Sequence, residues 1–258
     1  MNYIGIDIGS TCAKTVVLNE KKEIIQEFVQ PTGWSSVDTA EEIRQKLELA
    51  GINLSDDSSC CVATGYGRIS VPYADKTVTE ITCHALGAVH LFQQPDLTVI
   101  DIGGQDTKII QIEQGFVKDF IMNDKCAAGT GRFLEVMANT LSLRPNEMFD
   151  LARLGSDTTI SSMCTVFAES EVIGLIGKGE PKENIAYAVV NSTIRKVAAQ
   201  VSRMNGEMST FCLTGGLCEC EYIREALSKE LGKEVISCPD ARYAGAIGAA
   251  LSAMKIRK

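Results

Sequence analysis

The chain has 258 residues, of which 45% are hydrophobic and 22% charged; this composition is typical of a folded globular protein and excludes intrinsic disorder. The formal net charge of −8, without a long Lys or Arg run, argues against a nucleic acid or an anionic membrane surface as the main partner. The chain opens on an apolar strand pattern without the segments of a signal peptide, and no apolar run reaches the length of a membrane span, so we expect a cytoplasmic protein.

The pattern of apolar residues predicts alternating strands and helices. The first segment, YIGIDIGSTCAKTVVLNEKKEII at residues 3–25, predicts two strands joined by a glycine turn. The segment LTVIDIGGQDTKIIQIEQGFV at residues 97–117 repeats this hairpin pattern. Helical spacing of apolar residues predicts helices at 37–50, 77–94, 131–153, 166–178 and 183–205, and a closing Ala/Gly-rich helix at 241–255.

A turn of sequence D-I-G, with a Lys seven residues after the Asp, occurs twice. The copies are 94 residues apart and consist of Asp7, Gly9 and Lys14 and of Asp101, Gly103 and Lys108. This offset is too large for a solenoid repeat and indicates two duplicated α/β halves. We therefore expect one subdomain of residues 1–98 plus 240–258 and a second of residues 99–239.

Each D-I-G turn has the residue types of a phosphate-binding site. Backbone N–H groups can approach phosphate oxygens at such a turn because Gly has no Cβ to obstruct them. The adjacent carboxylates of Asp7 and Asp101 suit a hydrated Mg²⁺ that bridges phosphates. One such turn equally fits an ordinary hairpin, whereas the duplicate favours a clamp on a polyphosphate.

A third glycine turn, Thr214-Gly215-Gly216, follows an apolar strand predicted in MSTFCLTGG at residues 208–216, and it suits a flat adenosine moiety. Three turns in the order phosphate, phosphate, adenosine resemble the ASKHA superfamily of actin, heat-shock chaperones and sugar kinases. The resemblance implies a duplicated α/β two-domain fold with nucleotide in the interdomain cleft. A sugar kinase also needs a base for the substrate hydroxyl and chain to enclose the sugar, and the sequence has no clear insert for this.

Ten cysteines are many for this length, and their scattered spacing does not fit a secreted disulfide framework, so we expect reduced thiols or metal ligands. Adjacent Cys60 and Cys61 lie in a predicted strand and face opposite ways, which disfavours a shared metal. Cys218 and Cys220 form a lone C-x-C without the second pair of a zinc site. A structural role is expected for these four and for four more: Cys12, Cys83, Cys212 and Cys238.

The remaining cysteines are Cys126 in MNDKCAAGTGRF and Cys164 in SSMCTVFAESEV, and each stands just ahead of, or within, the first turn of a predicted helix. The N–H groups and dipole of a helix N-terminus stabilise a thiolate or an anionic iron–sulfur cluster. A cubane takes four thiolates, so one chain supplies half of the ligands and a twofold dimer supplies all four. Two buried cysteines on core helices remain the alternative.

In this order, GIDIGSTCAK, ATGYGR, DIGGQDTK, MNDKCAAGTGRF, SSMCTVFAESEV and TGG resemble the activators, or component A, of 2-hydroxyacyl-CoA dehydratases. These belong to the BadF/BadG/BcrA/BcrD family of benzoyl-CoA reductase ATPase subunits. The resemblance runs from about residue 3 to about residue 253. It implies a homodimeric ATPase with a 4Fe-4S cluster bridging the subunits through Cys126 and Cys164, which passes a low-potential electron to a partner iron–sulfur enzyme.

Within this hypothesis the residues of the two turns take specific roles. Asp7 and Asp101 hold Mg²⁺, and Gln105 orients the attacking water unless it is only a turn residue. Lys14 contacts phosphate or is a solvated hairpin lysine, and Glu169 reaches the ribose or lies on a helix surface. The phosphate contacts are expected from five residues: Gly9, Ser10, Thr11, Gly103 and Gly104.

The hypothesis also assigns partners. Reduced ferredoxin or flavodoxin gives an electron to the cluster, ATP closes the two domains, and the acceptor then docks. The expected acceptor is a 2-hydroxyacyl-CoA dehydratase, and the expected host is anaerobic. One alternative keeps the ATPase but gives it a double-cubane cluster protein or another low-potential reductase as acceptor. A second alternative is a small-molecule kinase of the same fold with incidental cysteines.

Smaller motifs have two interpretations each. Asn123 and Asp124 cap the helix that follows or brace the cysteine loop. Gly65, Gly67 and Arg68 of ATGYGR form a tight turn or a docking loop. The two histidines are six residues apart, off the same-face spacing of a helical metal pair, so we expect them to be structural.

Overall fold

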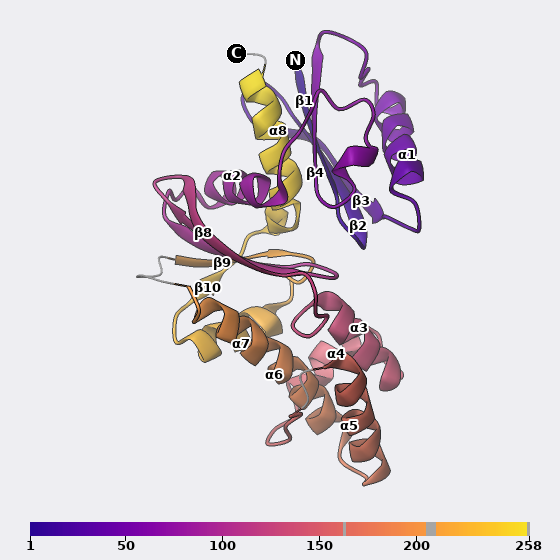
Figure 1. Cartoon of the computed structure of the whole chain (residues 1–258), viewed down its shortest axis with the longest axis vertical. Helices are drawn as coiled ribbons and strands as arrows, with labels where there is room; N and C mark the ends of the chain where they lie inside the picture. The colour runs from indigo at the N-terminus through magenta and orange to yellow at the C-terminus, as the bar shows by residue number, and fades with distance from the viewer. Residues whose placement is uncertain (162–163, 205–209, 257–258) are drawn as a thin grey trace. The chain divides into compact units, whose positions relative to one another are not determined.

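The computed structural model describes residues 1–161, 164–204 and 210–256 (Figure 1). Ser162 and Met163 of the second cysteine motif, the last position of the helix predicted at 183–205 and the start of the strand predicted at 208–216 lie outside the described residues. The strands are β1 (Asn2–Ile8), β2 (Cys12–Leu18), β3 (Ile24–Pro31), β4 (Ser59–Thr64), β5 (Lys76–Thr77), β6 (Leu97–Ile102), β7 (Thr107–Glu113), β8 (Phe116–Asn123), β9 (Thr210–Gly215) and β10 (Val235–Ile236).

The helices follow the predicted periodicity in most places. They are α1 (Ser36–Leu49), α2 (Glu80–Phe92), α3 (Gly131–Thr140), α4 (Pro145–Ala152), α5 (Thr165–Gly177), α6 (Lys182–Val201), α7 (Glu221–Leu231) and α8 (Ala244–Ile256), with 3-10 turns at Arg68–Ser70 and Pro239–Tyr243. The single helix predicted at 131–153 is wrong. Ser142 has a left-handed backbone with φ of 55°, and Pro145 cannot continue a helix from the preceding turn, so α3 and α4 are separate.

Two five-stranded sheets have the same strand order. The first runs β3-β2-β1-β4-β5 and the second, read from its other edge, runs β8-β7-β6-β9-β10. In the first sheet β1 is antiparallel to β2 and parallel to β4, so this sheet is mixed. Each strand of the first sheet therefore has a counterpart in the second, as the repeated D-I-G turn predicted.

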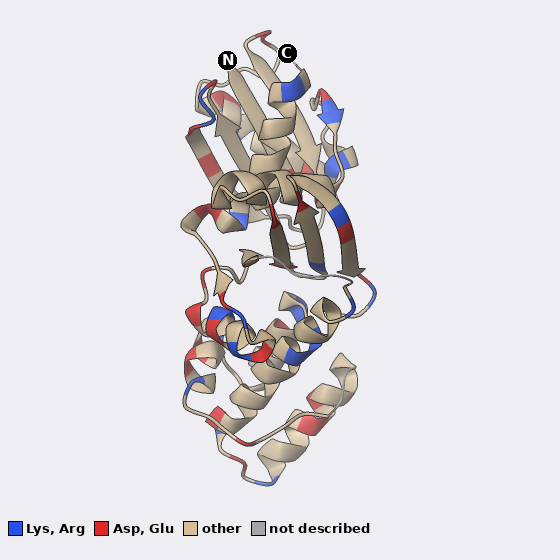
Figure 2. Ribbon diagram, turned by 90° about the vertical axis from the view of Figure 1, so that its left-hand side faces the viewer, with Lys and Arg blue, Asp and Glu red and all other residues tan. Residues whose placement is uncertain are grey.

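The chain forms two compact units. The first comprises residues 1–97, 110–118 and 238–258, and the second comprises residues 98–109 and 119–237. In Figure 2 most strands are drawn in tan and the charged residues lie mainly on helices and loops, in keeping with strands that supply the cores. No helix among the described residues is long and apolar enough to cross a membrane.

In the first unit, helices cover both faces of the sheet. Ile4, Ile6 and Ile8 of β1 share a core cluster with Ile43 and Leu47 of α1. The other face packs on α8 and α2, and Figure 1 shows α1 and α8 on opposite sides of this sheet. Strand β4 divides its side chains between these layers, with Cys60 in the cluster of α8 and Cys61 in the cluster of α1. The prediction that these two thiols face opposite ways is confirmed.

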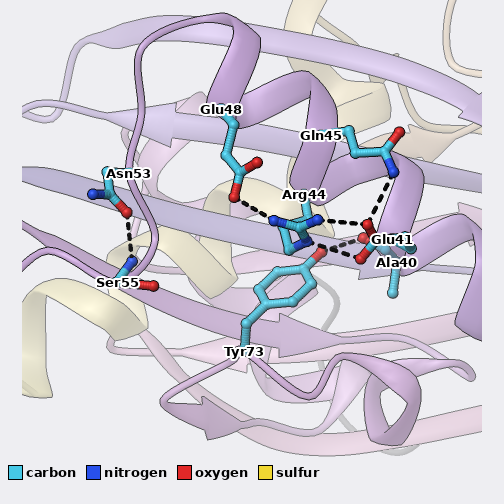
Figure 3. Close-up of polar contacts among 8 residues, drawn as sticks. All are labelled: Ala40, Glu41, Arg44, Gln45, Glu48, Asn53, Ser55 and Tyr73. Atoms are coloured by element: carbon cyan, nitrogen blue, oxygen red, sulfur yellow. Dashed lines mark hydrogen bonds and ion pairs between the residues drawn. The ribbon is translucent and has the colours of Figure 1, made fainter.

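Ion pairs along the solvent face of α1 complete this layer (Figure 3). Arg44 pairs with Glu41 at 2.6 Å and with Glu48 one turn further on. The hydrogen bonds from Arg44 lower the pKa of Glu41 to about 2. The Tyr73 hydroxyl donates to the Ala40 carbonyl at 2.6 Å and so fastens the segment after β4 to this helix.

In the second unit, helix α6 is the central helix and buries ten residues, among them Ile185, Val189 and Val197. Helix α5 differs, because it buries only Ala168 and Val172. Four large apolar side chains of α5 are exposed: Val166, Phe167, Ile173 and Ile176. The helix that starts at Cys164 therefore presents an apolar surface to solvent.

Close packing of α8 on α2 depends on glycine, and this gives a stability prediction. A Cβ on Gly248 would lie 1.8 Å from the Cys83 carbonyl oxygen, whereas one on Gly174 of α5 would meet no atom within 4 Å. Both glycines are inside helices, so Ala improves helix propensity equally at each. We expect Gly248→Ala to lower the free energy of unfolding by about 3 kcal/mol and Gly174→Ala to leave it unchanged or raise it by up to about 1 kcal/mol. Urea unfolding measures both, and equal effects would contradict the packing.

Candidate functional site

The two D-I-G turns have the same backbone geometry. The Gly9 N–H donates to the Cys12 carbonyl at 3.1 Å, and the Gly103 N–H donates to the Asp106 carbonyl at 2.9 Å. The central N–H groups, those of Ser10 and Thr11 and of Gly104 and Gln105, donate to no other residue in the described part of the chain. Each turn thus offers two backbone donors to an anion.

Asp7, at the carboxyl end of β1, is almost fully buried at 3% exposure. Its Oδ2 lies 4.0 Å from His84 Nε2 on α2, while its Oδ1 accepts no hydrogen bond from the described residues. The carboxylate is enclosed by glycine, since a Cβ on Gly65 would lie 2.5 Å from Oδ1 and one on Gly245 2.5 Å from Oδ2. A buried carboxylate oxygen without a donor is a fitting ligand for a hydrated cation.

Asp101, at the end of β6, is equally buried but has protein partners. Its Oδ2 accepts a hydrogen bond from the Thr214 hydroxyl at 2.7 Å, and its Oδ1 lies 3.6 Å from Lys108 Nζ. The buried Lys108 ammonium also pairs with Asp106 at 2.7 Å. The Asp101 carboxylate therefore has both a hydrogen-bond donor and a cation within the protein, whereas Asp7 Oδ1 has no donor among the described residues.

Each carboxylate lies against a Thr-Gly turn from the neighbouring strand. Gly215, the last residue of β9, has φ of 83°, and its Cβ position would fall 3.0 Å from Asp101 Oδ2. Gly65, which follows β4, has φ of 86° and lies against the Asp7 carboxylate in the same way in the first half. The structure thus brings the turn predicted for adenosine into contact with Asp101, and it favours the tight-turn interpretation of ATGYGR.

Of the ten cysteines, only Cys126 and Cys164 are exposed. Burial raises the pKa of several other thiols. It raises that of Cys83 to about 12, and it raises those of Cys220 and Cys238 above the usual value of a thiol. These thiols are poor metal ligands because the thiolate is the ligating form. The alternative that Cys126 and Cys164 are buried core residues is wrong.

The loop of Cys126 is held from one side by Asn123, the last residue of β8. The Asn123 amide donates to the Cys126 carbonyl at 2.8 Å and to the Ala128 carbonyl at 3.1 Å, so Asn123 braces the loop and does not cap a helix. The N-cap of α3 is Thr130. Cys126 therefore lies five residues ahead of α3, which begins at Gly131, the start predicted from the sequence.

Cys164 is the N-cap residue of α5, as predicted. Ser161 is bonded to this helix, because its N–H donates to both Glu171 carboxylate oxygens at 3.1 Å. Within the described ranges no three His, Cys, Asp or Glu side chains come together as a metal site. The two exposed thiols therefore fit a cluster only as part of a larger ligand set.

Four further predicted residues have varied surroundings. Gln105 is exposed at the second turn, and half-buried Lys14 on β2 lies opposite Asp7 in the strand register. Gly216, after the Thr-Gly turn, has open space around its Cβ position. The Glu169 carboxylate accepts a hydrogen bond from the Thr140 hydroxyl at 3.1 Å, which ties α5 to α3. The described contacts do not bring Glu169 to either turn.

Sequence reasoning missed two features. His84 beside Asp7 gave no signal because its partner is distant in the sequence. A cavity of about 210 Å³ in the second unit also gave none; its lining includes Gly129, Phe133, Ser192, Arg195 and Lys196. Spacing of three and four residues along α6 places Ser192, Arg195 and Lys196 near one another, but this signal is too common to identify a site.

Comparison with known proteins agrees with this geometry. Residues 4–253 match the model of the BadF/BadG/BcrA/BcrD ATPase family. The chain is 44% identical to the (R)-2-hydroxyglutaryl-CoA dehydratase activating ATPase of Acidaminococcus fermentans, over 98% of this chain and 96% of that protein. The crystal structure of that organism's dehydratase component A superposes with a TM-score of 0.91 over both whole chains, at 41% identity. An activator of 2-hydroxyisocaproyl-CoA dehydratase from Clostridium difficile, solved with bound ADPNP, superposes with a TM-score of 0.89, at 35% identity, over 99% of this chain and 95% of that one.

A more distant likeness concerns the fold alone. A glucokinase of the ROK family from Streptomyces griseus superposes with a TM-score of 0.59 over 99% of this chain and all of that one, at 17% identity. Together with the two mixed sheets, this confirms the predicted ASKHA fold class.

The burial of Lys108 gives a prediction in which the first half of the chain is the control. Lys108→Met leaves Asp101 and Asp106 without their cation, so we expect the free energy of unfolding to fall by about 3 kcal/mol or more. Lys14 holds the same position in the first half but forms no ion pair with a described residue, so Lys14→Met should cost less than about 1 kcal/mol. Urea unfolding of both variants checks this, and a similar loss in each would show that the Lys108 pairs contribute little.

Proposed function

The chain belongs to the BadF/BadG/BcrA/BcrD ATPase family, and from this premise we propose that it uses ATP to deliver a low-potential electron from a 4Fe-4S cluster to a partner iron–sulfur enzyme. The observation that carries the proposal is the selective exposure of Cys126 and Cys164 in a chain whose other eight thiols are buried or half-buried. Two exposed thiols per chain supply half of the four thiolates that a cubane takes.

ATP binding is assigned to the backbone of both turns. The N–H groups of Ser10 and Thr11 and those of Gly104 and Gln105 donate to phosphate oxygens, and the glycines Gly9 and Gly103 permit the approach. Asp7, whose Oδ1 has no donor among the described residues, would hold Mg²⁺, and Asp101 has the corresponding place in the second turn, where Thr214 and Lys108 fix it. Bound Mg²⁺ would supply neutralisation of the phosphate charge, and the Gln105 side chain would orient the attacking water.

The adenosine is assigned to the turn at Thr214, Gly215 and Gly216, and a separate cavity of the second unit, whose lining does not include this turn, is a second candidate for the base. The cavity is lined in part by the ring of Phe133, and it carries two cations, Arg195 and Lys196. An apolar cavity with a few placed polar groups suits a nucleobase, whose flat face attracts a guanidinium.

The cluster is assigned to Cys126 and Cys164 of two copies of the chain. Each chain offers two exposed thiols and a cubane takes four, so a twofold homodimer completes the ligand set. When bound, the cluster stores one electron and passes it on. Both thiols are accessible, because Cys126 lies on the loop that Asn123 braces and Cys164 is the N-cap of α5.

The acceptor is proposed to be a 2-hydroxyacyl-CoA dehydratase, since the named relatives act on enzymes of this class. Reduced ferredoxin or flavodoxin is the proposed donor. Nothing in the chain selects one acyl-CoA, so the activator serves whichever dehydratase its surface recognises.

Iron content tests the central proposal. Protein purified without oxygen should be a dimer with about two iron and two sulfide per chain, which corresponds to one cubane per dimer. Cys126→Ser and Cys164→Ser should each reduce the iron to near zero with the fold intact, as measured by iron assay, circular dichroism and molar mass.

Cys220→Ser is the matched control for this experiment. Cys220 is also a helix N-cap, that of α7, but it is half-buried and burial raises its pKa, so its loss should leave the iron content unchanged. Protein that remains free of iron after anaerobic reconstitution would reject the electron-transfer proposal and leave an ATPase without a redox role.

The cavity assignment predicts an effect on nucleotide affinity. Arg195→Ala removes a cation from the lining, so ADP should bind about five- to thirtyfold more weakly by isothermal titration calorimetry. Arg203→Ala makes the same charge change at an exposed position beyond α6 and should leave the affinity unchanged. Equal affinities of both variants would place the base elsewhere.

A further inference from the structure

The carbonyl side of the second phosphate turn is bonded to the segment that follows Cys126. The Gly131 N–H donates to the Gly103 carbonyl at 2.9 Å, and the Arg132 N–H donates to the Gly104 carbonyl at 2.7 Å. These donors are the first residues of α3, five and six positions after Cys126. The turn and the cysteine loop are thus joined within a single compact unit.

The same peptide groups face the phosphate site. The Gly103 carbonyl and the Gly104 N–H belong to one planar peptide unit, and the Gly104 carbonyl and the Gln105 N–H belong to the next. In a trans peptide these two groups point in opposite directions. A phosphate bound to the N–H groups therefore polarises, and fixes the orientation of, the carbonyls that hold the start of α3.

Thr107 makes a third connection. It is the first residue of β7, fully buried, and its hydroxyl donates to the Gly129 carbonyl at 2.6 Å. Gly129 has φ of 86° and sits in the turn between Cys126 and α3, while Asn123 holds the other end of that loop. The Cys126 loop is consequently held at three places. Asn123 holds its start, the second D-I-G turn holds its end at α3, and Thr107 of β7, the strand that follows this turn, holds Gly129 between them.

The first half of the molecule shows that a phosphate turn does not require this arrangement. There the carbonyls of Gly9 and Thr11 are taken by Thr32, from its hydroxyl at 2.7 Å and its N–H at 3.0 Å. The position that corresponds to Thr107 is Ala13, which has no hydroxyl. The hydroxyl of Thr107 is therefore a feature of the half that carries the cysteines.

We propose that the peptide units from Gly103 to Gln105, with Thr107 as a positioning residue, couple occupation of the phosphate site to the conformation of the Cys126 loop. The inference rests on the proposed function, because it requires nucleotide at this turn. Phosphate binding orders the loop through bonds inside the second unit, and Thr107 transmits the effect to Gly129.

Hydrogen–deuterium exchange of the full chain tests the coupling. A non-hydrolysable ATP analogue with Mg²⁺ should slow amide exchange at the turn, residues 103–106, and should also slow it at residues 124–132 by roughly fivefold. In Thr107→Val, which keeps the shape but cannot donate, the slowing at the turn should persist while that at 124–132 is lost. Nucleotide affinity, measured by calorimetry, should stay within about twofold.

Three further variants make the result specific. Thr107→Ser keeps the hydroxyl and should retain the slowing of exchange in both segments. Thr107→Ala copies Ala13 of the first half and should lose the slowing of exchange at residues 124–132. The alanine variant keeps the test decisive if the valine variant folds poorly. Thr193→Val is the matched control, since Thr193 is equally buried in this unit but its hydroxyl has no partner among the described residues.

The outcomes separate the inference from the proposed function. Protection of the turn without any change at residues 124–132 in the unmodified chain would overturn the coupling and leave ATP binding intact. Undiminished slowing in both the valine and alanine variants would overturn the role of Thr107. An analogue that neither binds by calorimetry nor protects the turn would overturn the proposed function itself.

Discussion

A buried aspartate at the carboxyl end of a central strand is the constraint that organises each half of this molecule. A carboxylate that is 2–3% exposed must be compensated by a cation or by hydrogen bonds, because burial of an unpaired charge is costly. Around Asp7 and Asp101 the same solution recurs: a glycine turn follows the strand, and a left-handed glycine from the neighbouring strand lies against the carboxylate. The sheets, with matching strand order, position these two turns.

Local sequence was sufficient to predict the parts of this arrangement that depend on residue type. The two D-I-G turns could be predicted because Asp, Gly and the following strand are adjacent in the chain, and the repetition after 94 residues favoured a duplicated fold over a chance hairpin. Exposure of Cys126 and Cys164 agreed with their motifs. The break between α3 and α4 was missed because apolar periodicity continues across it, although Pro145 marked the position.

Long-range contacts could not be predicted from the same information. His84 lies 77 positions after Asp7, and the cavity near Arg195 is built from loops and helices that meet only in the folded unit. The Cys126 loop illustrates the same point. Its sequence predicted a helix from residue 131, where α3 begins, but gave no sign that backbone hydrogen bonds join the start of this helix to the second D-I-G turn.

The duplication is most informative where its two halves differ. In the second half Lys108 and Thr214 compensate Asp101, so this carboxylate is a structural anchor of the turn and is less available to a cation. In the first half Asp7 keeps one oxygen without a donor among the described residues, so the proposed cation site is assigned mainly to this half. The second turn differs, because Asp101 has protein partners and the carbonyls of the turn are bonded to α3. Under the proposed coupling this turn transmits phosphate binding to the cysteine loop, and the two copies of the repeat then have different proposed roles: cation binding in the first half and coupling to the cysteine loop in the second.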